Sequence, residues 1–152
     1  MTTAPVARRA ARVLLVDAAG RVLLFRGHDP EQPAAGSWWF TVGGGLDEGE
    51  SPREAAAREL FEETGLVLAA SAFGESVFRS TAEFALAGVR YIQEQDFFLA
   101  QVDSHEVDTV GFTELEESFV LGHHWWTREE LRTTADTVYP GQLADLLDGL
   151  GV

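Results

Sequence analysis

A helix with clear boundaries is the feature that most constrains how this chain can fold. Ser51 is a good N-cap, Pro52 suits the first helical position, and Glu54 completes a capping box with the cap residue. Gly65 suits the left-handed conformation that often ends a helix. The sequence therefore predicts a helix over residues 52–64.

The predicted helix has an apolar face and an acidic face. The residues expected to face the core are Ala56, Ala57, Leu60 and Phe61. Glu59, Glu62 and Glu63 are spaced i, i+3 and i+4, which stacks three carboxylates on the opposite face. Such pairs repel by about 0.2–0.5 kcal/mol each in an isolated helix. A bound Mg²⁺ would offset this repulsion, whereas the alternative is a solvated helix face.

Strand-like apolar runs lie on both sides of the predicted helix. The strands expected before it cover residues 12–17, 22–28 and 38–42. The strands expected after it cover residues 77–86, 89–102 and 120–126. The glycines at 43–45 read as a turn, and residues 103–117 as an acidic, irregular segment.

Two short helices are expected near the end of the chain. Thr127 and Glu130 form a second capping box, and a last amphipathic helix carries Leu143 and Leu147. Because strands and helices interleave, we expect one α/β or α+β domain over residues 8–152, after a loose tail of residues 1–7.

Composition narrows the possible functions. The formal net charge of −14 argues against binding to a nucleic-acid polymer, which needs a basic surface. There is no cysteine, so thiolate zinc sites and cysteine nucleophiles are excluded. Arg8, Arg9 and Arg12 imitate the start of a signal peptide, but the apolar run after them is too short. No run approaches the roughly 20 apolar residues of a membrane span, so we expect a cytoplasmic protein without a membrane partner.

The segment over residues 44–66 closely resembles the Nudix box. That pattern is Gly, five residues, Glu, seven residues, then Arg-Glu-apolar-x-Glu-Glu-x-Gly-apolar. The nine matching positions are Gly44, Glu50, Arg58, Glu59, Leu60, Glu62, Glu63, Gly65 and Leu66. One departure lies just outside the pattern, because many relatives have Pro where this chain has Val42.

The resemblance implies a fold and a reaction. The implied fold is an α/β/α sandwich around a mixed sheet, and dimers are common in the family. The implied reaction is hydrolysis of a nucleoside diphosphate linked to another moiety, with Mg²⁺ or Mn²⁺. Nucleoside triphosphates, ADP-ribose, dinucleoside polyphosphates and nucleotide sugars all remain open as the small-molecule substrate.

The resemblance also assigns roles within the box. It implies that Glu59 and Glu63 are the central metal ligands, with Glu62 beside them, and that a glycine carbonyl such as that of Gly44 adds a ligand. Hard cations prefer such oxygen ligands, and they neutralise the charge of a pyrophosphate during attack by water.

Arg58 and Glu50 are expected to support these ligands. Arg58 would orient a glutamate such as Glu50 through a bidentate ion pair, since a guanidinium holds a carboxylate in a fixed geometry. Gly65 would have a structural role at the end of the helix.

The general base remains open between the box and the acidic segment. Relatives with a similar Trp-Trp strand favour Glu116, while in several Nudix enzymes a box glutamate such as Glu62 or Glu63 serves instead. The other acidic candidates are Glu94, Glu114 and Glu117.

Two further residues are candidates for substrate contact. Trp39 could stack on a nucleobase and Arg26 could contact phosphate. The alternatives are core packing for Trp39 and a solvated strand edge for Arg26.

Two other functions compete with hydrolysis. A Nudix domain can sense a nucleotide without cleaving it, but such domains commonly carry a degraded box or a DNA-binding segment, and this chain shows neither feature. Isopentenyl-diphosphate isomerisation uses the same fold with a cysteine, which this chain lacks.

Overall fold

The computed structural model describes residues 4–86 and 88–152, and it divides into two compact units. Unit 1 consists of the described residues up to Val13 together with Gly43–Leu99 and Val107–Gly111. Unit 2 consists of Leu14–Val42, Ala100–Glu106 and Phe112–Val152. Three strands contribute residues to both units: β1 (Val6–Val16), β3 (Ser37–Gly45) and β5 (Val89–Gln101).

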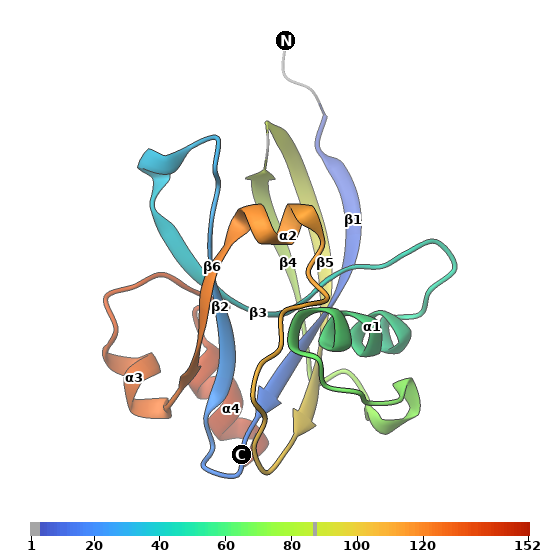
Figure 1. The fold of residues 1–152 in the computed structure, drawn as a ribbon, viewed down its shortest axis with the longest axis vertical. Helices are drawn as coiled ribbons and strands as arrows, with labels where there is room; N and C mark the ends of the chain where they lie inside the picture. Colours follow the sequence, from blue (N-terminus) through green and yellow to red (C-terminus); the bar gives the residue numbers. More distant parts are fainter. Residues whose placement is uncertain (1–3, 87) are drawn as a thin grey trace. The chain divides into compact units, whose positions relative to one another are not determined.

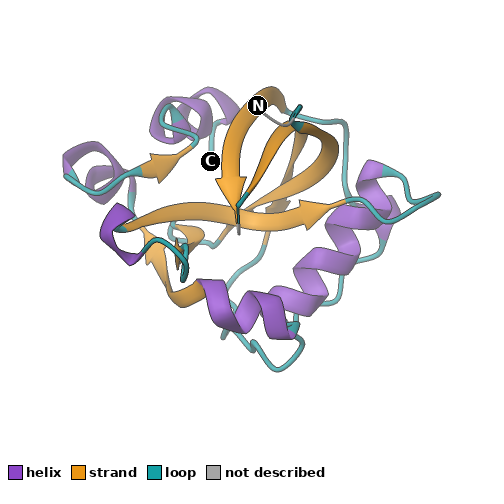
Figure 2. Cartoon of the chain, turned by 90° about the horizontal axis from the view of Figure 1, so that it is seen from above, coloured by secondary structure: helices purple, strands orange, loops and turns teal. Residues whose placement is uncertain are grey.

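Unit 1 is built around a long antiparallel hairpin. Strand β4 (Phe78–Leu86) pairs with β5 in the register that places Phe78 opposite Phe97. The strand order in this unit is β4-β5-β1, and the end of β3 pairs with β1 as well. Helix α1 (Pro52–Thr64) and the short 3₁₀ helix η2 (Ala70–Ala72) follow β3 in the chain (Figure 1). Figure 2 shows the twist that strands of this length acquire.

The boundaries of α1 are confirmed. The Ser51 side chain accepts a hydrogen bond from the Glu54 backbone N–H, and the Glu54 side chain accepts one from the Ser51 N–H. Gly65 ends the helix in the left-handed conformation, at φ 77°. A side chain at Gly65 would be strained by this positive φ, and its Cβ would in addition lie 3.0 Å from the Asp108 Cβ.

The predicted burial of α1 is wrong in part. The buried residues are Ala55, Ala56, Glu59, Leu60, Glu63 and Thr64, whereas Phe61 is 54% exposed. Two of the three stacked carboxylates are therefore turned into the protein, on the same side as Leu60. The hydrophobicity of Phe61 and the charge of Glu63 predict the reverse, and the partners that override them come from distant parts of the chain.

Strands β1 and β3 are longer than the sequence predicts. Strand β1 begins at Val6, and in its added part the Arg9 side chain contacts Asp96 on β5. Residues 1–3 of the predicted N-terminal tail lie outside the described residues. Strand β3 continues through Gly45, so the glycines at 43–45 form strand and not the predicted turn.

Unit 2 is also arranged around antiparallel strands. Strand β2 (Val22–His28) pairs with β3 on one side and with β6 (Val120–Trp126) on the other, and the end of β1 meets β2 at Val16. The two-residue strand β7 (Val138–Tyr139) pairs with β3 in parallel, so the sheet is mixed. These features, together with four α-helices in the described residues, confirm the α+β class.

Helices complete unit 2. Helix α3 (Arg128–Thr133) has the predicted capping box, and α4 (Leu143–Leu150) buries Leu143 and Leu147. Helix α2 (Glu114–Phe119) lies in the segment predicted to be irregular. The Thr113-x-x-Glu116 capping box that opens α2 is a local pattern from which this helix could have been predicted. Within the described residues, no helix has the length and apolar composition of a membrane span.

Candidate active site

Two buried carboxylates form the centre of the box in unit 1. Glu59 is 8% exposed and Glu63 is 2% exposed, although both carry charged side chains. Each offers a carboxylate oxygen, and these two oxygens lie within 4.8 Å of one another. Burying carboxylates this deeply is costly unless hydrogen bonds or opposite charges compensate them. Glycines at the end of β3 and two arginines provide such partners.

The glycines allow the chain to approach α1 and β1 closely. The Gly43 backbone N–H donates a hydrogen bond of 2.7 Å to Oε1 of Glu63. A Cβ at Gly43, whose φ is 137°, would lie 2.1 Å from the carbonyl oxygen of Ala11. A Cβ at Gly44 would lie 2.6 Å from Oε1 of Glu59. Gly43 therefore requires glycine, because the β1 backbone leaves no room for a Cβ, whereas a side chain at Gly44 would displace the Glu59 carboxylate.

Arg58 gathers four carboxylates around one guanidinium. It forms the predicted bidentate ion pair with Glu50, through Nε to Oε2 at 2.8 Å and Nη2 to Oε1 at 2.9 Å. Its Nη1 also donates to Glu59 at 3.0 Å and to Glu62 at 3.2 Å, and its Nε lies 3.2 Å from Asp47. In addition, its Nη2 donates to the Gly45 carbonyl at 2.9 Å. Arg58 thus connects the loop before α1 to the carboxylates of Glu59 and Glu62 on the helix.

These contacts shift the protonation equilibria of the pair. The hydrogen bond from Arg58 is the main cause that lowers the pKa of Glu50 below its ordinary value of 4.5. The same hydrogen bond is the main cause that raises the pKa of Arg58. Both groups therefore stay charged over the whole neutral range.

Arg12 is a second cation beside the carboxylates, and sequence reasoning missed it. Its Nη1 donates to the Gly43 carbonyl at 2.9 Å, and its Nε donates to Oε1 of Gln95 at 3.2 Å. Burial is the main cause that lowers its pKa, and the charges of Glu63 and Glu59 oppose that shift. Arg12 is one of three arginines in β1, and its spacing alone does not distinguish it from Arg8 and Arg9.

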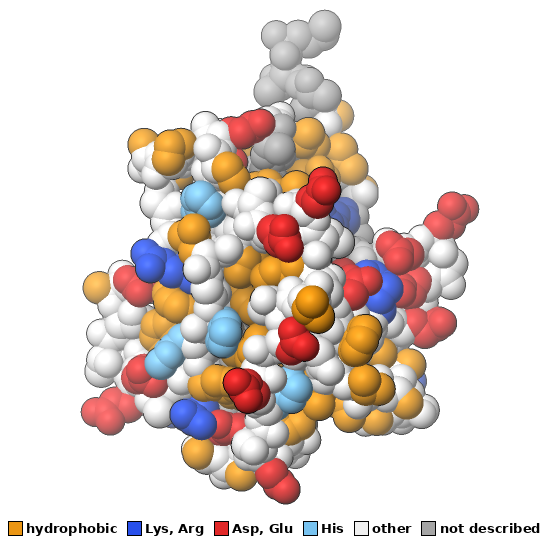
Figure 3. Space-filling view, in the orientation of Figure 1, with side chains coloured by type: hydrophobic (Ala, Val, Ile, Leu, Met, Phe, Trp, Pro, Cys, Tyr) orange, Lys and Arg blue, Asp and Glu red, His pale blue; other side chains and the backbone are white. Residues whose placement is uncertain are grey.

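Negative charge exceeds positive charge in this cluster. Five carboxylates, which belong to Asp47, Glu50, Glu59, Glu62 and Glu63, lie beside Arg12 and Arg58, and Arg8 is a third cation close to Arg12 and Gly45. Near the loop that leads into α1, Figure 3 shows acidic side chains around a basic one. An excess of oxygen ligands with net negative charge fits a hard divalent cation such as Mg²⁺ or Mn²⁺.

The other acidic candidates differ in exposure and in the element on which they lie. Glu62 is more open than its two neighbours, with a side chain that is 31% exposed. Glu116 lies on α2 in unit 2, where its Oε1 accepts the Thr113 N–H in the capping box. Of the other acidic candidates, Glu94 lies on β5, and Glu114 and Glu117 lie in the first turn of α2.

The residues predicted to contact substrate lie in unit 2. Arg26 on β2 is directly opposite Trp39 on β3, and its Nε donates to Ser37 Oγ at 2.9 Å. The Trp39 indole N–H donates to Asp136 at 3.1 Å, and its ring packs edge-on against Trp126 at 5.1 Å. Trp39 therefore packs against another aromatic ring, which was the alternative to its predicted contact with substrate. That contact stays a prediction.

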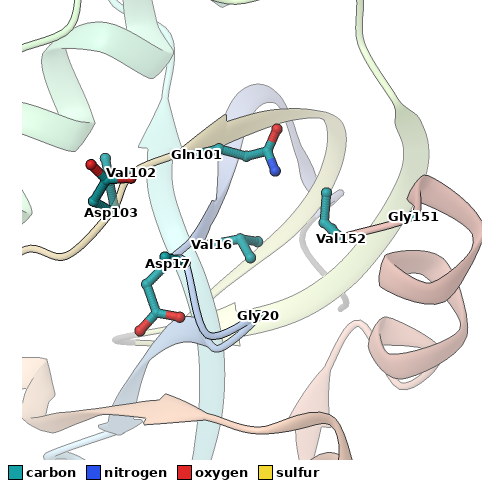
Figure 4. A pocket seen from close by; sticks show the side chains of 9 residues that line it. Val16, Asp17, Gly20, Gln101, Val102, Asp103, Gly151 and Val152 are labelled. Carbon is teal, nitrogen blue, oxygen red and sulfur yellow. The ribbon is translucent and has the colours of Figure 1, made fainter.

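Two pockets have no box carboxylate among their lining residues. One of about 550 Å³ in unit 2 is lined by the turn after β1, the residues after β5 and the last two residues of the chain (Figure 4). Its Asp17 carboxylate bonds to the Arg21 side chain and to turn amides. The other, of about 310 Å³ in unit 1, contains Arg9 and Arg79 balanced by Glu94 and Asp96.

Comparison with known proteins gives a consistent result. A family model described as NUDIX domain matches residues 6–146. An RNA pyrophosphohydrolase of Dinoroseobacter shibae is 44% identical over 61 residues, which cover 40% of this chain and 36% of that protein. An RNA pyrophosphohydrolase of a Psychrobacter species is 31% identical over 123 residues, which cover 74% of this chain and 65% of that protein. The matched part of this chain therefore spans between about a third and two thirds of these relatives.

A solved structure has the same fold. The crystal structure of a MutT protein from Methanosarcina mazei Go1 has a TM-score of 0.72 and 17% sequence identity, with coverage of 99% of this chain and 96% of that one. At this identity the likeness concerns the fold alone.

Proposed function

The chain belongs to the NUDIX domain family, and from that premise we propose that it is a metal-dependent pyrophosphohydrolase. Its substrate would be a nucleoside diphosphate joined to a further group. The observation that carries this proposal is the buried pair Glu59 and Glu63 within an excess of carboxylates. A fold that only needed a stable helix would gain little from burying two charges there.

Each box residue has a place in this proposal. Glu59 and Glu63 would hold the cation, with Glu62 beside them and the Gly44 carbonyl as a further oxygen ligand. When bound, Mg²⁺ or Mn²⁺ neutralises pyrophosphate charge and favours the ionised form of an attacking water. Arg58 keeps Glu50, Glu59 and Glu62 in fixed positions, because its five N–H donors have rigid geometry.

The general base is proposed to be a glutamate with access to solvent. Glu62 meets this condition within the box, since it is the most exposed of the three stacked carboxylates. Glu116 is the proposed alternative outside the box. Gln variants at the two positions separate these roles, because loss of the base removes the acidic limb of the pH profile of kcat while leaving metal affinity in place.

Two substrate classes follow from different observations. The net charge of −14 favours a small nucleotide, because a polymer would be repelled along its whole length. The two relatives described above are named RNA pyrophosphohydrolases, which makes the 5′ triphosphate end of RNA the second candidate. A sensing domain that binds nucleotide without cleaving it is the competing class of function.

A panel of substrates tests the proposal. The purified chain would be incubated with nucleoside triphosphates, ADP-ribose, dinucleoside polyphosphates, nucleotide sugars and a 5′-triphosphorylated RNA. Each would be assayed with Mg²⁺, with Mn²⁺ and with EDTA, and the products would be separated by chromatography. We expect cleavage of at least one pyrophosphate bond that EDTA abolishes. Nucleotide binding without any product would identify a sensing domain instead.

A further inference from the structure

A network of side chains extends from β4 across β5 to β1 in unit 1. The Gln95 amide donates to Ser80 Oγ at 3.2 Å, and its Oε1 accepts hydrogen bonds from Arg12 Nε at 3.2 Å and from Gln93 Nε2 at 2.9 Å. Gln93 is 1% exposed, so part of this network lies in the interior of the unit. Such interior networks restrict the rotamers of their members.

The network ends at the Gly43 peptide. Arg12 Nη1 donates to the Gly43 carbonyl, and the Gly43 N–H donates to Oε1 of Glu63. The Gly43 backbone also lies very close to β1, since a Cβ on Gly43 would overlap the Ala11 carbonyl oxygen. The position of Arg12 can therefore influence the hydrogen bond on Glu63 through the φ and ψ torsions of Gly43.

The charge of Arg12 helps to compensate the buried carboxylates of Glu59 and Glu63, but it does not help these carboxylates to bind a cation. A guanidinium beside Glu59 and Glu63 repels any metal that these carboxylates bind. Arg58 already supplies a cation to the same cluster. What Arg12 adds is geometric: two N–H groups on one rigid plane connect β5 to the Gly43 carbonyl.

We propose that Arg12 and Gln95 are positioning residues that fix the Gly43 peptide and, through its N–H, the orientation of the Glu63 carboxylate. The use of that orientation for metal binding rests on the proposed function. Outer partners of metal ligands typically change metal affinity by 10–100-fold.

Two variants that conserve charge test this role. Arg12→Lys keeps the positive charge but loses the planar pair of donors, and Gln95→Met keeps the volume but loses the acceptor and the donor. Arg9→Lys is the matched control, since Arg9 is the exposed neighbour on β1 and pairs with Asp96. Thermal denaturation of all variants would verify that they are folded.

The first measurement uses metal-free protein. Hydrogen exchange of the Gly43 amide, followed by NMR, is expected to accelerate in Arg12→Lys and in Gln95→Met but not in Arg9→Lys. The second measurement is Mn²⁺ affinity by electron paramagnetic resonance. We expect a loss of about 10-fold in Arg12→Lys, a smaller loss in Gln95→Met and no loss in Arg9→Lys.

The two measurements separate this proposal from the proposed function. Wild-type exchange at Gly43 in both folded test variants would overturn the positioning role. Wild-type Mn²⁺ affinity in both would overturn it as well, because Glu63 would then bind without the network. If the wild-type chain binds no Mn²⁺, the proposed function fails, and the exchange rates alone decide whether the network positions Glu63.

Discussion

At the scale of single residues, the box is a set of charges held by backbone groups and arginines. Glu63 accepts a peptide N–H, Glu59 packs against a glycine, and Glu50 is fixed by Arg58. Each of these contacts removes freedom from a carboxylate before any ligand arrives. The site is therefore preorganised by its own chain, which is the usual requirement for precise metal and substrate binding.

Gly44→Ala should damage the site more than the fold. The new Cβ would lie 2.6 Å from the Glu59 carboxylate, so that carboxylate must move. We expect turnover to fall by about 10-fold or more, as for other changes that displace a metal ligand. Gly74→Ala is the control, because nothing lies within 4 Å of its Cβ position. Equal turnover in the two variants would contradict the contact between Gly44 and Glu59.

Glu50→Gln should change how stability depends on acid. Arg58 lowers the pKa of Glu50 below 4.5 in the folded protein, so the unfolded chain takes up this proton first. The stability that Glu50 contributes is thus present above pH 4.5 and is lost as the pH falls through the lowered pKa. In thermal denaturation between about pH 3 and pH 7, the Tm gap between wild type and Glu50→Gln should narrow in acid. A gap that stays constant would contradict the ion pair.

At the scale of elements, α1 shows which features a sequence can reveal. Its ends were predicted correctly because the groups that set them, Ser51, Glu54 and Gly65, are neighbours in the chain. Which of its faces is buried was predicted incorrectly. The partners of Glu63 and Glu59 come from β1 and β3, and no local pattern places them there.

The same distinction between local and distant partners explains which features of the strands were predicted. Strand β1 is joined to β5 by contacts of Arg12 with Gln95 and of Arg9 with Asp96, which are 83 and 87 residues apart in the chain. The sequence therefore predicted the composition of the box and the bidentate Arg58–Glu50 pair. It did not predict Arg12, because the role of that residue exists only once β1 and β5 are paired.

Substitutions at two adjacent residues of α1 test which face of the helix is buried. Leu60 is fully buried and Phe61 is 54% exposed, although the two are adjacent and both apolar. Leu60→Ala should lower the free energy of unfolding by about 2–5 kcal/mol, whereas Phe61→Ala should lower it by less than about 1 kcal/mol. Urea denaturation of both variants measures the difference. A loss of about 2–5 kcal/mol in both variants would instead support the apolar face predicted from the sequence, in which both residues are buried.

At the scale of the whole molecule, family membership and charge agree on the type of function. A chain with a net charge of −14 can act on an anionic substrate only if something reverses the charge at the site. A cation held by the box would do so. The central claim is therefore that the carboxylates of α1 support hydrolysis and are not needed for folding.

The turnover of Glu63→Gln with Mg²⁺ tests this claim most directly, on whichever substrate the wild-type chain cleaves. The variant keeps an oxygen that can accept the Gly43 N–H, so its Tm should equal or exceed that of the wild type. Its turnover should fall by more than about 100-fold, because even outer partners of metal ligands cost 10–100-fold. Turnover at the wild-type level in a folded Glu63→Gln variant would contradict the account.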